Sequence, residues 1–155
     1  MATIFTNYTS AAHTSAGAIL SICATLPATY DNTGFSALTW VPVHEISDMG
    51  ELGMEFKEVN HLSLDTRNTT KFKGSYDAGT MQLTLAKVET DPGQALFLTA
   101  LNSDSDYAFS IYFPQTANNI YVTGKVMSYK TKVGNVDSML TATCKLALTN
   151  YIVEH

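Results

Sequence analysis

The chain has 155 residues, 15% of them charged, and carries a formal net charge of −5 at pH 7. This length is typical of one domain with its own core. Because a protein that grips phosphates needs a basic face, the acidic balance excludes an ordinary nucleic-acid-binding protein. No stretch reaches the ~20 apolar residues of a membrane span. Residues 1–17 show no signal peptide, so we expect a protein kept in a cytoplasm without a membrane partner.

The first third of the chain predicts a loose arm followed by two short strands. Residues 1–17, rich in Thr, Ala and Ser, show no consistent period and predict an N-terminal arm. Residues 18–25 predict a strand, which turn-forming residues follow. Residues 37–46 predict a second strand, in which Pro42 favours a sheet edge or a bulge because proline cannot donate to a ladder. The turn-forming residues are Pro27, Asp31, Asn32 and Gly34.

The middle of the chain combines a strand with a long polar segment. Residues 54–62 alternate apolar and polar side chains and predict a strand. Residues 63–79 (SLDTRNTTKFKGSYDAG) are polar and include the basic residues Arg67, Lys71 and Lys73. Because this segment is too long for a tight hairpin turn, we expect either a solvated loop or a loop that contacts acidic patches on a neighbouring copy.

Strand patterns are strongest in the second half of the chain. Residues 80–85 and 107–113 show the alternation of half-buried strands. Residues 119–132 and 138–153 are longer, and Gly134-Asn135 lies between them, which predicts a long hairpin. Strands of more than ten residues exceed the usual ~5–6 and indicate a sheet that continues beyond one small core.

One helix is predicted within residues 91–104 (DPGQALFLTALNSD), mainly over residues 91–102. The pattern places Asp91 as the N-cap, Pro92 at the first helical position and Gln94 as the returning residue of a capping box. An apolar stripe on this helix would close one face of the β structure. Its members are Ala95, Phe97, Leu98 and Leu101.

Residue patterns for catalysis, a cofactor or a metal are missing from the sequence. Cys23 and Cys144 lie in apolar runs without CxxC spacing, so we expect two buried free thiols rather than ligands. His44 and His61 are expected to be structural strand residues, and no nucleophile motif accompanies them. The acids around Asp104 lack the glycine and glutamate of an EF-hand loop. The sequence therefore predicts a protein that is not an enzyme and needs no cofactor.

Two functional classes remain. A monomeric β-sandwich carbohydrate-binding module could present an aromatic platform, although aromatic residues on alternating strands more often lie in the core. Subunit contacts within an assembly are favoured by the arm, the long loop and the long strands, because exposed strand edges invite strand addition. Copies that associate head-to-tail about an axis can close into a ring. The platform residues would be Trp40, Tyr107, Tyr112, Tyr121 and Tyr129.

Four segments of the chain resemble the tail tube (major tail) proteins of siphophages, the long-tailed bacteriophages. They are ALTWVPVHEISDMGELG, LDTRNTTKFKGSYDAGTMQLTLA, DPGQALFLTALNSDSDYAFSI and YVTGKVMSYKTKVGNVDSMLTATCKLALTNYIVE, and the earlier LPATYDNTGFSALTW is also similar. Their order and spacing cover almost the whole chain after residue 17. The resemblance implies a mainly β fold, a β-sandwich or barrel-like domain with one flanking helix. It implies a single tail tube domain over residues 18–155, preceded by the arm.

The resemblance also implies how copies assemble. In this family, six subunits form a ring whose inner sheets join into one barrel around a lumen, and the rings stack into a tube. By resemblance, the long central loop, here about residues 44–80, reaches from one ring to the next, and the two termini add contacts. The matching loop positions are Asp65, Arg67, Lys71, Phe72 and Lys73, and the C-terminal positions are Ile152, Val153, Glu154 and His155.

Partners and a location follow from the same resemblance. The expected partners are other copies of the chain, a tape-measure protein inside the tube, a tail terminator and tail-tip proteins. Double-stranded DNA is expected to pass through the lumen during ejection without specific binding, since an acidic or neutral lining repels phosphates. The expected location is the virion tail, after assembly in the host cytoplasm. A contractile tail tube or a secretion needle shares the fold and remains a related alternative.

Overall fold

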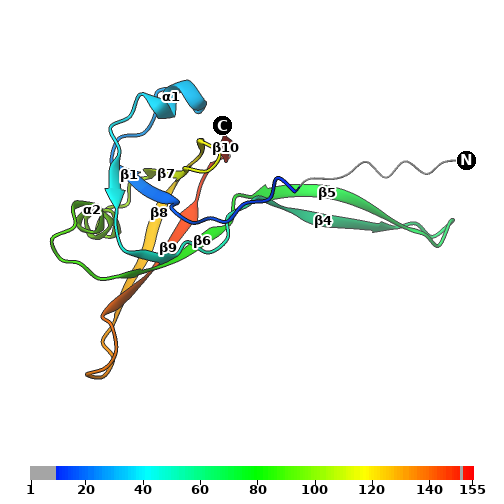
Figure 1. The fold of residues 1–155 in the computed structure, drawn as a ribbon. Helices are drawn as coiled ribbons and strands as arrows, with labels where there is room; N and C mark the ends of the chain where they lie inside the picture. Colours follow the sequence, from blue (N-terminus) through cyan, green and yellow to red (C-terminus); the bar gives the residue numbers. More distant parts are fainter. Residues whose placement is uncertain (1–9, 151) are drawn as a thin grey trace, which may run out of the picture.

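The computed structural model describes residues 10–150 and 152–155. An eight-stranded antiparallel sheet curls into the body of the molecule, and a two-stranded hairpin projects from it (Figure 1). This architecture confirms the predicted mainly β fold with a flanking helix, α2. The strands are β1 (Ile19–Cys23), β2 (Val41–Val43), β3 (Ile46–Asp48), β4 (Glu55–Leu62), β5 (Thr69–Asp77), β6 (Thr80–Ala86), β7 (Tyr107–Phe113), β8 (Asn118–Lys132), β9 (Thr141–Leu148) and β10 (Val153–Glu154), and the helices are α1 (Asn32–Ser36) and α2 (Pro92–Leu101).

Strand β8 has fifteen residues and connects the two halves of the body. Its first half pairs with β7 over residues 118–124, and its second half pairs with β9 over residues 124–132. The sheet order is β2-β1-β7-β8-β9-β6-β3, and β10 also pairs with β8. The predicted long hairpin is therefore confirmed, although its second strand ends at Leu148 and the chain rejoins the sheet at β10.

The main core lies on one face of the curled sheet, against α2. Met81, Leu83 and Leu85 of β6 each expose at most 1% of their surface, as their alternation predicts. The Phe97 ring of α2 lies 5.7 Å, centroid to centroid, from the Phe109 ring of β7. Full burial of such side chains stabilises the fold by about 1.5–3 kcal/mol each.

A smaller core lies under the segment that carries α1. The Tyr121 ring of β8 stacks on the Phe35 ring, with centroids 5.1 Å apart, and on the Trp40 ring, with centroids 5.9 Å apart. The Asp31 carboxylate caps α1 by accepting a hydrogen bond from the Gly34 amide at 2.8 Å. Residues predicted to make only a turn therefore make a short helix, because an Asp N-cap satisfies one of the free amides at its start.

The strand predicted over residues 37–46 is shorter in the structure. Only β2 forms there, and β3 begins at Ile46 after Glu45, whose φ of 62° interrupts the strand. Pro42 lies in β2, an edge strand of the sheet, as predicted. His44 lies in the connection between β2 and β3 rather than on a strand, whereas His61 lies on β4 as expected.

Helix α2 begins as predicted, with Asp91 as its N-cap. The predicted apolar stripe is confirmed only for Phe97, which is buried, and Leu101, which packs against the main core. Ala95 and Leu98 are exposed. The helix approaches β2 so closely that a Cβ atom on Gly93 would lie 2.4 Å from the Pro42 carbonyl oxygen. Close packing between α2 and β2 therefore requires a residue without a side chain at Gly93. The buried residues of α2 are Gly93, Gln94, Phe97 and Ala100.

The buried Gln94 side chain joins three segments instead of completing a capping box. Its amide nitrogen donates to the carbonyl oxygens of Ala86, at 3.0 Å, and His44, at 3.2 Å. Its Oε1 atom accepts from the Val88 amide at 2.9 Å. The Asp91 carboxylate accepts from the amides of Gln94 and His44. These bonds tie the β2–β3 connection to α2 and to the end of β6.

Cys23 and Cys144 are both buried free thiols, as predicted. Burial raises the pKa of the Cys144 thiol to about 12. Since the thiolate is the reactive form, Cys144 is protected from oxidation and metal binding while the chain is folded.

We predict that Gln94→Ala lowers the free energy of unfolding by about 3 kcal/mol or more. The substitution removes the partners of two carbonyl groups and one amide that are partly buried, at about 1 kcal/mol or more each. Urea unfolding would measure the change. Gln82→Ala, whose side chain is exposed on β6, is the matched control and should stay within about 0.5 kcal/mol of the wild type. Equal effects of the two substitutions would contradict this role for Gln94.

Candidate functional site

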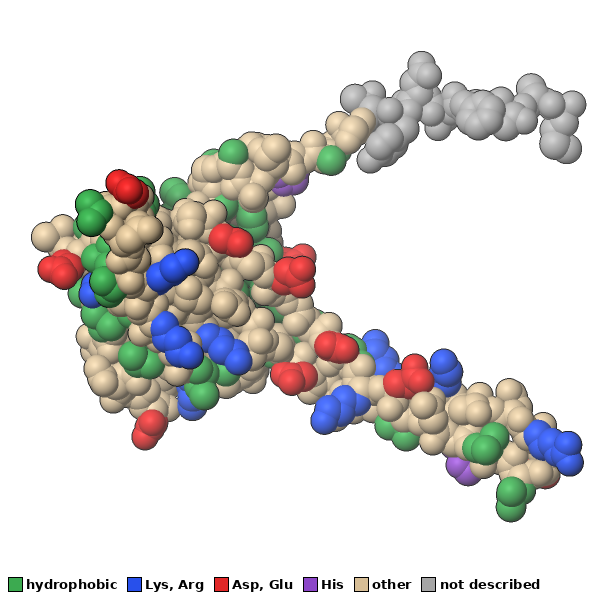
Figure 2. Space-filling view, turned by 90° about the horizontal axis from the view of Figure 1, so that it is seen from below, with side chains coloured by type: hydrophobic (Ala, Val, Ile, Leu, Met, Phe, Trp, Pro, Cys, Tyr) green, Lys and Arg blue, Asp and Glu red, His purple; other side chains and the backbone are tan. Residues whose placement is uncertain are grey.

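The hairpin of β4 and β5 projects well beyond the body and is exposed along most of its length (Figures 1 and 2). The prediction of a loop over residues 63–79 is therefore wrong for 69–77, which form β5. The pairing with β4 runs from Glu55 opposite Asp77 to Leu62 opposite Thr69 and uses the backbone groups that a loop would leave to water. The turn itself is residues 63–68, where Arg67 has a φ of 53°.

One face of this hairpin carries charged and aromatic side chains. The Lys71 Nζ atom lies 3.7 Å from the Glu58 Oε1 atom. The Lys73 Nζ atom lies 3.7 Å from the centre of the Phe56 ring, in a cation–π contact. Phe56 in turn packs on Tyr76, with ring centroids 5.9 Å apart. These exposed contacts contribute little to stability, but they hold the charges in a row along the hairpin.

Large apolar side chains stand in solvent on the hairpin and at its tip. Val59 and Phe72 are opposite each other on the second face and are 51% and 54% exposed. Leu62 and Leu64, next to the turn, are 63% and 97% exposed. Several large apolar side chains exposed on one projecting hairpin are typical of a surface that another molecule covers.

The five predicted loop residues all lie on this hairpin, but on different sides of it. Lys71 and Lys73 share the charged face, and Phe72 lies on the apolar face. Asp65 and Arg67 lie in the turn. The hydroxyl of Ser63 donates to the Asp65 carboxylate, and this hydrogen bond lowers the pKa of Asp65. The hairpin therefore presents two chemically distinct faces and a charged tip.

The predicted C-terminal contact residues belong to the subunit's own sheet. In β10, Val153 pairs with Tyr121 and Glu154 pairs with Ile120 of β8. Ile152 and Val153 are half-buried against the main and smaller cores, and Glu154 is exposed. Contact of these residues with another subunit stays a prediction, for which the exposed Glu154 side chain is best placed.

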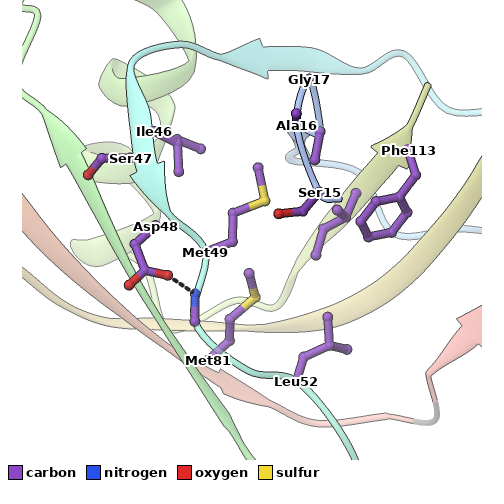
Figure 3. A pocket seen from close by; sticks show the side chains of 13 residues that line it. Ser15, Ala16, Gly17, Ile46, Ser47, Asp48, Met49, Leu52, Met81 and Phe113 are labelled. Carbon is purple, nitrogen blue, oxygen red and sulfur yellow. Dashed lines mark hydrogen bonds between the residues drawn. The ribbon is translucent and has the colours of Figure 1, made fainter. Parts of the chain in front are cut away.

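The predicted N-terminal arm lies partly outside the described residues, which begin at residue 10. Residues 10–17 are exposed, and residues 15–18 line one side of a cavity of about 430 Å³ (Figure 3). Met49 and Met81 point into it, and the Asp48 carboxylate accepts a hydrogen bond from the Gly50 amide at its edge. The cavity is mainly apolar and brings no catalytic pair together.

The aromatic residues of a carbohydrate platform do not gather on one surface. Trp40 and Tyr121 belong to the smaller core, whereas Tyr107 and Tyr129 pack with the main core. Burial raises the pKa of both Tyr121 and Tyr129. A platform that stacks on sugars needs exposed ring faces, so this arrangement favours the core interpretation of these residues.

Groups of three or more His, Cys, Asp or Glu residues that could hold a metal do not occur among the residues that the structure describes. In the same part of the chain, no helix is long and apolar enough to cross a membrane.

Comparison with known proteins places the chain among tube proteins. Residues 25–151 match the family model described as lambda phage tail tube protein. A sheath/tube terminator of an extracellular contractile injection system is similar in structure, with a TM-score of 0.69, 9% identity, and coverage of 96% of this chain and 99% of that chain. No curated protein sequence matches the chain.

Two further solved structures show the same fold. The SPP1 tail tube has a TM-score of 0.62 and 12% identity, covering 89% of this chain and 76% of that chain. A chain from the virion of a native gene transfer agent particle has a TM-score of 0.61 and 9% identity, covering 88% and 95%. At these identities, the structural similarities establish the fold.

We predict that Leu64→Ser changes the free energy of unfolding by less than about 0.5 kcal/mol, because this side chain is exposed in the subunit. Phe97→Ala, in the main core, is the control and should cost about 3–5 kcal/mol. Thermal unfolding of the dilute protein would compare the two. A large loss for Leu64→Ser would show that the hairpin tip serves folding instead of contact.

Proposed function

Because the chain belongs to the lambda phage tail tube protein family, we propose that its copies form stacked rings of six around a lumen through which DNA passes. Membership of this family makes the chain a structural subunit of a tail tube in the virion, and not an enzyme. The finer proposal is a non-contractile, siphophage-type tube. A tube terminator of a contractile injection system has the same fold, so fold alone does not separate the two types.

The observation that carries the proposal is the β4–β5 hairpin. It extends away from the body, and more than half of the surface of each of its apolar residues Val59, Leu62, Leu64 and Phe72 is exposed in the subunit. A hairpin of this length can reach a copy in the next ring. Apolar area removed from water there would favour stacking by about 25 cal/mol per Å². We propose that residues 18–155 act as one domain and that the arm of residues 1–17 adds further contacts.

The charge balance of the chain suits a conduit for DNA. Its net charge is −5, and the hairpin balances its four basic residues with four acidic residues. Because the net charge of the chain is negative and that of the hairpin is balanced, duplex DNA would meet little overall attraction between the tube and its phosphates. The tube would enclose a tape-measure protein, end in terminator and tail-tip proteins, and assemble in the host cytoplasm.

Negative-stain electron microscopy of the concentrated protein tests this proposal. Rings or tubes with a central hole are expected. A strictly monomeric protein with affinity for glycans would overturn the proposal in favour of the carbohydrate-binding alternative.

We predict that Arg67→Ser/Lys71→Ser/Lys73→Ser weakens ring stacking at least roughly tenfold while leaving the subunit folded. The three side chains are exposed, and they lie where a neighbouring copy would meet the hairpin. Tube yield by microscopy and thermal unfolding of the subunit measure the two effects. Glu89→Ser/Asp104→Ser removes exposed charges away from the hairpin and should leave tube yield unchanged. Normal tubes from the triple variant would remove the basic residues from the contact.

A further inference from the structure

The lower half of the body is a four-stranded sheet with two unequal edges. Its order is β8-β9-β6-β3, because β7 pairs only with residues 118–124 of β8. In the described part of the chain, residues 126–132 of β8 therefore pair on one side only, with β9. At the other edge, β3 pairs only with β6. Residues 15–18 lie across the cavity from β3, but they belong to no strand.

The pairing register places the two edges at the same level. Asp48 of β3 is opposite Thr84, Thr84 is opposite Thr143, and Thr143 is opposite Lys130 of β8. Residues directly opposite each other share a face of the sheet. Asp48 and Lys130 therefore lie at the two ends of one row that runs across all four strands, on one face.

A second row lies beside the first. Ala86 is opposite Thr141, which is opposite Lys132. The Ala86 amide donates to the Glu45 carbonyl oxygen at 2.8 Å, so Glu45 ends this row at the β3 side. Asp48 of β3 thus ends the first row, and the backbone of Glu45, just before β3, lies level with the second row. Both rows end with a lysine on β8.

The four charged side chains are exposed and available. Within the described residues, ion pairs form between Lys71 and Glu58 and between Lys125 and Asp106, so none of the four edge residues takes part in one. Basic side chains also gather on the body, whereas acidic ones gather where the hairpin leaves it (Figure 2). The exposed residues at the edges are Glu45, Asp48, Lys130 and Lys132.

We propose that the acidic β3 edge of one copy pairs with the basic β8 edge of the next copy, with Asp48 facing Lys130 and Glu45 facing Lys132. This proposal deepens the proposed function and rests on it. The two edge strands run in opposite directions, since each neighbouring pair in the series is antiparallel. A copy rotated about an axis along the strands therefore brings β3 and β8 together as an antiparallel pair, at matching levels.

The charges also decide which pairings do not form. Two β8 edges would place lysines against lysines, and two β3 edges would place carboxylates together, and both arrangements repel. Only the unlike edges attract, so the contact is head-to-tail and can close into a ring. The exposed Met127 on β8 would lose solvent contact in the same step.

Mixing two charge-reversed variants tests this pairing. Lys130→Glu/Lys132→Glu makes both edges acidic, and Glu45→Lys/Asp48→Lys makes both edges basic. Each variant alone should need a protein concentration at least about tenfold higher for lateral association, measured by sedimentation. An equimolar mixture should associate again, because unlike edges meet at every contact of an alternating ring.

Two controls accompany the mixture. Asp104→Lys reverses an exposed charge after α2, away from both edges, and should associate like the wild type. Asp48→Lys also removes the side chain that accepts a hydrogen bond from the Gly50 amide. Glu45→Lys/Asp48→Asn therefore serves as a second variant of the β3 edge, because asparagine keeps an acceptor at this position. Mixed with Lys130→Glu/Lys132→Glu, it should restore association at least in part.

The outcomes separate this inference from the tube proposal. Wild-type tubes that persist in both reversed variants, or folded variants whose mixture stays apart, would overturn the edge pairing and leave the tube intact. Rings that depend on the edge charges but do not stack would support the edge pairing and count against the tube.

Discussion

The backbone groups on both edges of a strand need hydrogen-bond partners. On one edge of the fifteen-residue strand β8, β7 supplies them only along the first half. The rest of that edge keeps its backbone groups for water or for another chain. A closed sheet removes such edges, and copies joined side by side can close one that a single copy leaves open. The curled body therefore has two open sheet edges, β3 on one side and residues 126–132 of β8 on the other.

The hairpin of β4 and β5 leaves large apolar side chains exposed to solvent. Phe97 of α2, Phe109 and the leucines of β6 belong to one buried core, and the residues of that core lie outside the hairpin. Leu64 and Phe72 gain nothing from that core, although exposing them favours aggregation. Lys71 and Lys73 lie on the other face of the hairpin, where they contact Glu58 and Phe56. In the proposed assembly, the sheet edges would make contacts within a ring and the projecting hairpin would make contacts between rings.

Local chemistry made much of the fold predictable. The alternation of Met81, Leu83 and Leu85, the Asp91 cap and the edge position of Pro42 each depend on neighbours in sequence. Strand β5 was missed because a two-stranded ribbon with both faces in solvent needs no apolar alternation. The role of Gln94 could not be predicted, since its partners include His44, fifty residues away. For the candidate site, the sequence identified the hairpin residues as a basic segment. The rows of residues that connect the two sheet edges could not be predicted, because they depend on the register of four strands.

The central claim is that edges and faces left open in the subunit are covered by other copies. Amide hydrogen exchange, measured on the dilute subunit and on the concentrated assembled protein, tests it most directly. We expect amides within residues 126–132 and 55–77 to exchange at least about tenfold more slowly after assembly, while those of β6 stay slow in both states. Unchanged exchange in both segments of an assembled protein would contradict the account.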